Sequence, residues 1–384
     1  MLGYVNISIT RLLIMAVTDF DNRKGLDFPI VDSDIHTAYR TEAIREKIAS
    51  HLEEPYKTQL TRETINYGAY PRDSFNKEPV DTGDDTGPSV VRGPDDVQES
   101  LVDDMGIDVA ILNSLQKLDV IPSTERATRE MRAINDVFIE HFLDGNKNFY
   151  GLLMISTQRP EAAAEEIDRL AGEDQIVGGL ILNGPSAKPL GHEQYDIIYE
   201  AAEDNNLPMA FHTSAIGYAL NRKFPFLFND MENYAGLHTL SHPYANMATL
   251  TSLIMDGTVE KFPDLDFVFL EQDLGIVPLM MQRMNREAME KAHDLPLLQK
   301  SPEEYLRERF YFGTQPLPEP QDIRHARSLI DIVGPDNLLF ATDHPHPDFD
   351  EPEWVANKYF GHLDTEDQAK VFGGNAADVF GIDI

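Results

Sequence analysis

The chain has 384 residues, of which 66 are acidic and 32 basic, and its formal net charge is −34. A surface this acidic repels nucleic acid and anionic membranes, so neither is an expected partner. The chain has no cysteine, which excludes disulfides, thiolate metal sites and a cysteine nucleophile. Many acids, few lysines and no cysteine are together typical of a halophilic protein, although an ordinary acidic protein of a mesophile is the alternative.

Residues 1–28 are predicted to form an N-terminal extension. Its beginning is apolar but lacks the basic start and the small-residue cleavage site of a secretory signal peptide, so we expect translation to begin at Met15. No later stretch reaches the roughly 18 uninterrupted apolar residues that a membrane span needs. We therefore expect a cytoplasmic protein.

From residue 29 onward, short apolar runs alternate with segments of helical periodicity, which is the pattern of repeated βα units. The predicted strands, in chain order, are Ile30–Ile35, Val109–Asn113, Phe149–Ile155, Gly179–Asn183, Met209–Thr213, Phe267–Glu271, Phe310–Thr314 and Leu338–Thr342. The predicted helices include Ala127–Leu143, Pro160–Ala171, Glu193–Asn205, Ala245–Gly257, Val277–Lys291 and Ile323–Val333.

Eight such repeats over about 350 residues predict an α/β fold, a distorted (β/α)8 TIM barrel that forms one domain over residues 29–384. A doubly wound open sheet is disfavoured because no glycine-rich turn follows the first predicted strand. Two segments are longer than a single helix requires, an insertion of about 37–105 after the first strand and residues 214–240 after the fifth. Both leave from strand ends, so we predict that they are lids over the mouth of the barrel.

Metal-ligand side chains stand at the ends of three predicted strands. Asp34 and His36 end the first strand on one face, His212 belongs to the end of the fifth, and Asp343 follows the eighth. The carboxyl ends of barrel strands meet at one mouth. These four residues are therefore predicted to bind one divalent ion, for which Zn²⁺ is favoured and Mn²⁺ is possible. Structural roles, such as a core histidine at His212, are the alternative.

Acids and histidines near the same strand ends are candidates for catalysis. Asp343 is predicted to combine the roles of ligand and base. Glu271 is predicted to face inward with Phe267 and Phe269, where an apolar setting would raise its pKa and suit a general acid. An acid merely anchored by an arginine such as Arg283 is the alternative.

Further residues are predicted to line the pocket. His238 and His242 belong to the stretch Leu237–Pro243, and His242 is the stronger catalytic candidate. His346 flanks Asp343 and is predicted to bind the substrate. Arg40, four residues after His36, is predicted to bind a substrate carboxylate, with a surface salt bridge as the alternative.

At these positions the chain resembles the amidohydrolase-related (amidohydrolase 2) branch of the amidohydrolase superfamily, which contains aminocarboxymuconate-semialdehyde decarboxylase. Besides the ligand strands, the resemblance rests on Met105–Leu112, Gly257–Leu265 and Thr342–His346. It implies a (β/α)8 barrel, frequent homodimers and one metal ion held at Asp34, His36, His212 and Asp343. Two positions depart from the decarboxylase pattern: Asp34 replaces a histidine or glutamate, and Glu271 replaces a catalytic histidine.

The leading hypothesis is a metal-dependent carbon–carbon lyase that removes CO2 from a carboxylated small molecule. The same site could instead be a hydrolase, in which Asp343 activates a metal-bound water against a lactone, amide or ester. A barrel that has lost catalysis and serves as a binding protein is the third hypothesis, and it predicts a protein without stoichiometric metal.

Overall fold

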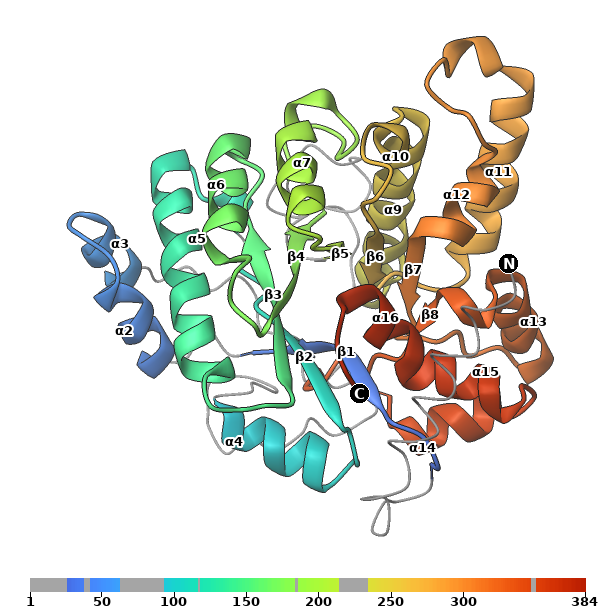
Figure 1. The fold of residues 1–384 in the computed structure, drawn as a ribbon, viewed down its shortest axis with the longest axis horizontal. Coiled ribbons are helices and arrows are strands. Elements are labelled where there is room, and N and C mark those ends of the chain that lie inside the picture. Colours follow the sequence, from blue (N-terminus) through green and yellow to red (C-terminus); the bar gives the residue numbers. More distant parts are fainter. Residues whose placement is uncertain are drawn as a thin grey trace.

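The structure is a computed structural model that describes residues 26–37, 42–62, 93–116, 118–183, 186–213, 234–346 and 350–384. In these ranges eight parallel strands form one sheet in sequential order (Figure 1). The strands are β1 (Val31–His36), β2 (Val109–Asn113), β3 (Phe149–Ile155), β4 (Ile176–Leu182), β5 (Met209–His212), β6 (Phe267–Leu270), β7 (Phe310–Gly313) and β8 (Leu338–Leu339).

The first strand joins the segment that follows the last strand, so the sheet is a nearly closed barrel. The backbone N–H of Ser33 donates to the carbonyl of Phe340, and that of His36 donates to the carbonyl of His344. This arrangement confirms the predicted (β/α)8 barrel. The last strand ends at Leu339, earlier than predicted, because the next N–H groups do not donate to a neighbouring strand's backbone: that of Phe340 donates to the carbonyl of Val371, and that of Ala341 to the hydroxyl of Thr314. The N–H of Thr342 donates to the Asp32 carboxylate.

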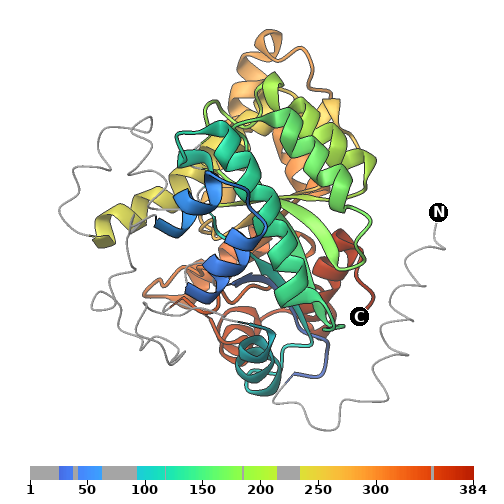
Figure 2. The same ribbon diagram turned by 90° about the vertical axis from the view of Figure 1, so that its left-hand side faces the viewer.

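The helices alternate with the strands and surround the barrel, and the early helices α2 and α3 lie outside α5 (Figure 1 and Figure 2). The α-helices are α2 (Glu42–Ser50), α3 (Tyr56–Arg62), α4 (Pro94–Val97), α5 (Thr124–Phe138), α6 (Pro160–Leu170), α7 (Asp196–Asp204), α9 (Tyr234–Met255), α10 (Thr258–Lys261), α11 (Ile276–Glu290), α12 (Pro302–Arg309), α13 (Ile323–Val333), α14 (Pro352–Val355), α15 (Thr365–Ala369) and α16 (Asn375–Phe380). None of the helices in the described ranges combines the length and apolar composition that a bilayer crossing requires.

The predicted starts of β4 and α9 also differ from the structure, and the reasons can be identified. β4 begins at Ile176, three residues before the predicted start, because the pair Gly178 and Gly179 lies inside the strand. A side chain at Gly178 would lie 2.9 Å from Leu152, so close packing requires glycine there. Helix α9 begins at Tyr234 and passes through Pro243, which the predicted start at residue 245 had avoided.

The register of β5 and β6 corrects the predicted orientation of Glu271. His212 of β5 pairs with Leu270 of β6, so Leu270 shares the face of His212. Phe267 instead contacts Tyr199 of α7, with ring centroids 6.2 Å apart, and therefore faces the helices. The prediction that Glu271 shares an inward face with Phe267 and Phe269 was therefore wrong. Glu271 lies just after the strand, and its positive φ of 50° breaks the alternation of side chains.

Several predictions fall partly or wholly outside the described residues. The extension 1–28 is described only from residue 26, and Arg40 lies outside the described residues. Of the two predicted lids, residues 63–92 and 214–233 also lie outside them. The lid roles and the division between extension and barrel stay predictions.

Candidate metal centre

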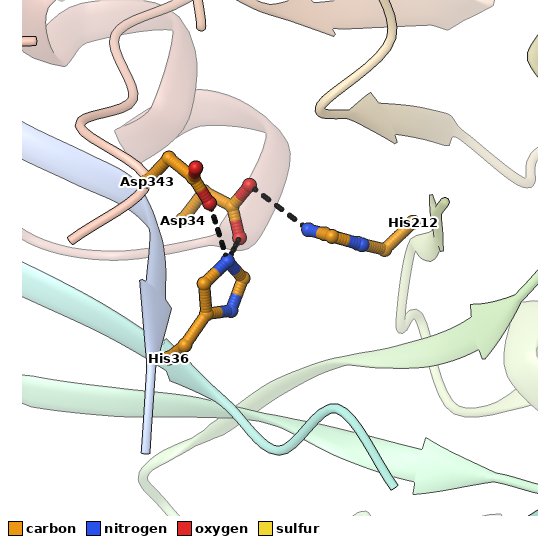
Figure 3. A group of neighbouring side chains, drawn as sticks. All are labelled: Asp34, His36, His212 and Asp343. Atoms are coloured by element: carbon orange, nitrogen blue, oxygen red, sulfur yellow. Dashed lines mark hydrogen bonds and ion pairs between the residues drawn. The ribbon is translucent and has the colours of Figure 1, made fainter. Parts of the chain in front are cut away.

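The four residues that were predicted to bind one ion lie together at the carboxyl ends of the barrel strands (Figure 3). One nitrogen or oxygen atom from each of Asp34, His36, His212 and Asp343 lies within 4.8 Å of the others, and all four side chains are buried. His36 Nε2 lies 2.6 Å from Asp343 Oδ1, and His212 Nε2 lies 3.4 Å from Asp34 Oδ2. We call these four residues the donor cluster.

The backbone explains how residues far apart in sequence reach this cluster. Asp34 and His36 are two positions apart on β1, so their side chains share one face. Asp343 follows β8, next to β1, and its N–H donates to the carbonyl of Asp34. Its φ of 63° is uncommon for a residue other than glycine, and such conformations concentrate at functional sites.

The hydrogen bonds of His36 orient its Nε2 atom toward the cluster. Its Nδ1 lies 2.7 Å from the side-chain oxygen of Asn113, whose amide nitrogen donates to Asp34 Oδ1. Since that amide oxygen can only accept, Nδ1 carries a hydrogen and Nε2 faces Asp343. Sequence reasoning missed Asn113, although its place at the end of β2, beside β1, was a usable signal.

His212 has the same orientation. Its Nδ1 lies 2.6 Å from the backbone carbonyl of Thr213, so Nδ1 is the donor and Nε2 faces the carboxylates. Three buried atoms of the cluster have no hydrogen-bond partner, namely His212 Nε2, Asp34 Oδ2 and Asp343 Oδ2. Buried polar atoms are rarely left unpaired, and imidazole nitrogens with carboxylate oxygens are common ligands of divalent ions. The donor cluster therefore fits a divalent cation.

The charges around His36 are strong enough to hold a cation at Nε2. Burial lowers its pKa, but the charges of Asp34 and Asp343 oppose that effect and raise the pKa to about 10. Without a metal ion, His36 is therefore protonated, and its positive charge offsets a negative charge of Asp34 and Asp343. Metal binding displaces such protons, because an imidazole ligand must be neutral.

Glu271 pairs with histidines, and its predicted raised pKa was wrong. His242 Nε2 lies 2.9 Å from Glu271 Oε1, and His212 Nε2 lies 3.4 Å from Oε2. Burial raises the pKa of Glu271, but the charges of the two histidines outweigh it and the pKa is about 2. The alternative of an arginine anchor at Arg283 was also wrong, since that side chain is 64% exposed and pairs with Glu287.

Two further residues lie close to Asp343: the candidate His346, three positions later in the sequence, and Asp32 of β1. His346 Nδ1 lies 2.9 Å from Asp343 Oδ1, and its ring centroid is 4.5 Å from that of His36. Asp32, to which no role had been given, accepts hydrogen bonds from the backbone N–H groups of Asp34 and Thr342. Burial raises the pKa of Asp32 to about 7. Asp32 thus fixes the backbone next to both carboxylates of the donor cluster.

Comparison with known proteins adds relatives of the whole barrel. A sequence profile described as amidohydrolase matches residues 27–382. Gamma-resorcylate decarboxylase of Polaromonas sp. is 27% identical over 297 residues, which cover 73% of this chain and 85% of that protein. The solved structure of an amidohydrolase from Mycobacterium avium subsp. paratuberculosis has a TM-score of 0.71 at 19% identity and covers 94% of this chain and 100% of that one.

A second solved structure adds a metal ion. It is the dihydroxybenzoic acid decarboxylase of Polaromonas sp. with bound manganese and the inhibitor 2-nitroresorcinol. Its TM-score is 0.65 at 22% identity, and the match covers 92% of this chain and 97% of that one. The two structural likenesses agree with the barrel fold described above.

Proposed function

The chain belongs to the amidohydrolase family, and from this premise we propose that it is a metal-dependent enzyme that removes the carboxyl group of a hydroxylated aromatic acid as CO2, without oxidation. The observation that carries the proposal is the buried donor cluster, with three atoms left without hydrogen-bond partners. The relative named gamma-resorcylate decarboxylase supports this reaction and this class of substrate.

We propose that Asp34, His36, His212 and Asp343 hold one divalent ion. Zn²⁺ was the first expectation, but two considerations favour Mn²⁺. Two carboxylates among four ligands suit Mn²⁺, which prefers oxygen donors. Manganese is also bound in the dihydroxybenzoic acid decarboxylase structure. The ion would bind oxygen atoms of the substrate and withdraw electron density from them.

The chain itself must supply one proton to the ring carbon that carries the carboxylate. Burial raises the pKa of Asp343, but His346 and His36 outweigh it and hold that pKa well below its usual range, so Asp343 is ionised in the free enzyme. We propose that Asp343 takes up a proton from His346 once the substrate is bound and donates this proton to the ring carbon. A C–H bond then forms with an electron pair of the ring, and the electrons of the broken C–C bond return to the ring as CO2 leaves. The products are CO2, the arene and the Asp343 carboxylate, so charge and atoms balance. His346, 2.9 Å from Asp343 Oδ1, would return a proton to Asp343 for the next cycle.

Glu271, His242 and Arg40 complete the proposed site. Glu271 and His242 form a buried pair beside His212, and we propose that this pair takes part in catalysis next to the ion of the donor cluster. Arg40 is proposed to bind an anionic group of the substrate. A homodimer, a cytoplasmic location and adaptation to high salt are further proposals, and light scattering of the purified protein would test the first of them.

The test measures which bond the enzyme breaks. Purified protein loaded with Mn²⁺ in high salt is incubated with hydroxybenzoates and, separately, with lactones, amides and esters, and the release of CO2 and of acid is followed. We expect CO2 from at least one dihydroxybenzoate, and its loss in Asp343→Asn. Asp331→Asn, which changes an exposed aspartate, is the matched control. Turnover of a lactone without CO2 from any aromatic acid would reject the lyase in favour of the hydrolase.

A further inference from the structure

A second group of metal-ligand side chains lies beside the donor cluster. His238, His242 and Glu271 each offer an atom within 4.8 Å of the others. The two histidines are four residues apart on α9 and therefore lie on one face of the helix, while Glu271 follows β6. We propose that these three residues bind a second divalent ion, and that Glu271 bridges it to the ion of the donor cluster.

Glu271 reaches both groups with different oxygen atoms. Its Oε1 lies 2.9 Å from His242 Nε2, and its Oε2 lies 3.4 Å from His212 Nε2. The side chain is buried, and its positive φ of 50° turns it out of the strand alternation. A carboxylate held between two imidazole nitrogens in this way is suited to contact one ion with each oxygen.

His242 is oriented as the histidines of the donor cluster are. Its Nδ1 lies 3.1 Å from the backbone carbonyl of His238 and 3.1 Å from Ser241 Oγ. A carbonyl can only accept, so Nδ1 carries a hydrogen, and Nε2, which faces Glu271, is the nitrogen that would give up its proton to bind an ion. Metal-bound histidines usually donate their other ring N–H to a carbonyl or carboxylate. The ring of His238 lies against that of His242, with centroids 4.1 Å apart, so both imidazoles lie close enough to bind the same ion.

The balance of charge favours a second cation, and this step rests on the proposed function. Asp34, Asp343 and Glu271 are buried and contribute three negative charges, and their ion pairs in the described part of the chain all involve histidines. One divalent ion would balance Asp34 and Asp343, and a proton on His242 would balance Glu271, so the site would carry no net charge. Two divalent ions, with the histidines neutral, would leave a net charge of plus one, which attracts a carboxylate substrate.

Two imidazole nitrogens and one carboxylate oxygen define the kind of ion. This set suits divalent ions of the first transition row, including Mn²⁺ and Zn²⁺. Three protein ligands leave coordination positions open for water or an anionic substrate. The second site would therefore take a divalent cation that can in turn contact a substrate carboxylate.

The experiment counts ions in the full-length protein. Protein saturated with Mn²⁺ in high salt is freed of unbound metal, and bound manganese is measured by elemental analysis and by electron paramagnetic resonance. We expect two ions per chain and a spectrum of two magnetically coupled ions. His238→Ala and Glu271→Gln should each bind one ion and give the spectrum of an isolated ion. His293→Ala removes a histidine that is 81% exposed, and it should retain two ions.

Each other outcome is decisive. One ion per chain in the unaltered protein, with both Mn²⁺ and Zn²⁺, would overturn the second site and leave the proposed decarboxylase intact. No bound ion would overturn both. Two ions in His238→Ala and in Glu271→Gln would also overturn the assignment, because the second ion would then lie elsewhere. If His238→Ala does not fold, Glu271→Gln, which keeps the size of the side chain, decides.

Discussion

Replacing Asp32 with asparagine should remove a pH-dependent cost from the fold. Asp32 is fully buried, and it accepts hydrogen bonds from the N–H groups of Asp34 and Thr342 and from the hydroxyl of Thr342. Burial raises its pKa from 3.8 to about 7, although these hydrogen bonds oppose the rise. The folded chain therefore keeps a proton on Asp32 over a range of pH in which the unfolded chain has lost it.

The sign and size of the effect follow from proton linkage. Between pH 4 and pH 7 the folded state binds more protons than the unfolded state, so its stability falls as the pH rises. For a pKa that shifts from 3.8 to about 7, the contribution of Asp32 falls by about 2.5 kcal/mol between pH 5 and pH 8. Asparagine cannot ionise. The stability of Asp32→Asn relative to the unaltered protein should therefore rise by that amount over the same interval.

Urea unfolding at constant high salt, after removal of metal by a chelator, measures this difference at each pH. The asparagine oxygen can still accept the two backbone hydrogen bonds, so the variant is expected to fold. Asp174→Asn, at an exposed position, is the control for changes in surface charge. If the difference between the unaltered protein and Asp32→Asn is the same at pH 5 and pH 8, the reasoning about burial is refuted.

Three further predictions concern the donor cluster, the packing and the surface. Asn113→Ala should weaken Mn²⁺ binding by about 10–100-fold, because Asn113 orients His36 and Asp34; competition with a coloured chelator measures this, and unchanged affinity would contradict it. Gly191→Ala should destabilise the fold by about 1–3 kcal/mol, because a Cβ there would lie 2.1 Å from the carbonyl oxygen of Ser252. Its control in urea unfolding is Gly172→Ala, where the space is open, and equal midpoints would count against the packing argument. The melting temperature should rise with KCl concentration, because salt screens the repulsion within a chain of net charge −34; a value independent of KCl would contradict this.

The position of the donor cluster could be predicted from two simple rules of protein structure. Buried strands appear in the sequence as short apolar runs, and the carboxyl ends of parallel strands meet at one mouth of a barrel. His36, His212 and Asp343 each stand at the end of such a run, and the structure brings them together with Asp34. Asn113 obeys the same rules. It was overlooked because a side-chain amide is a less common metal ligand than an imidazole or a carboxylate, and Asn113 acts by orienting His36 and Asp34.

Glu271 and α9 depended on features that periodicity does not contain. Strict alternation placed Glu271 on the side of Phe269, whereas a positive φ turns it toward His212. Nothing in an apolar run predicts where the backbone leaves the strand conformation. Pro243 suggested a later start for α9, because proline removes a hydrogen bond from a helix interior. The helix nevertheless continues through it, and so His238 and His242 lie one turn apart.

The junction of β1 with the region after β8 has a consequence for biosynthesis. His36 and Asp343 are 307 positions apart in sequence, yet they touch. A nascent chain still attached to the ribosome lacks Asp343, one of the four residues of the donor cluster, until its final strand has emerged from the exit tunnel. Loading of the ion must therefore follow translation of almost the whole polypeptide, and a prematurely terminated product would carry the first donors without ever assembling the centre.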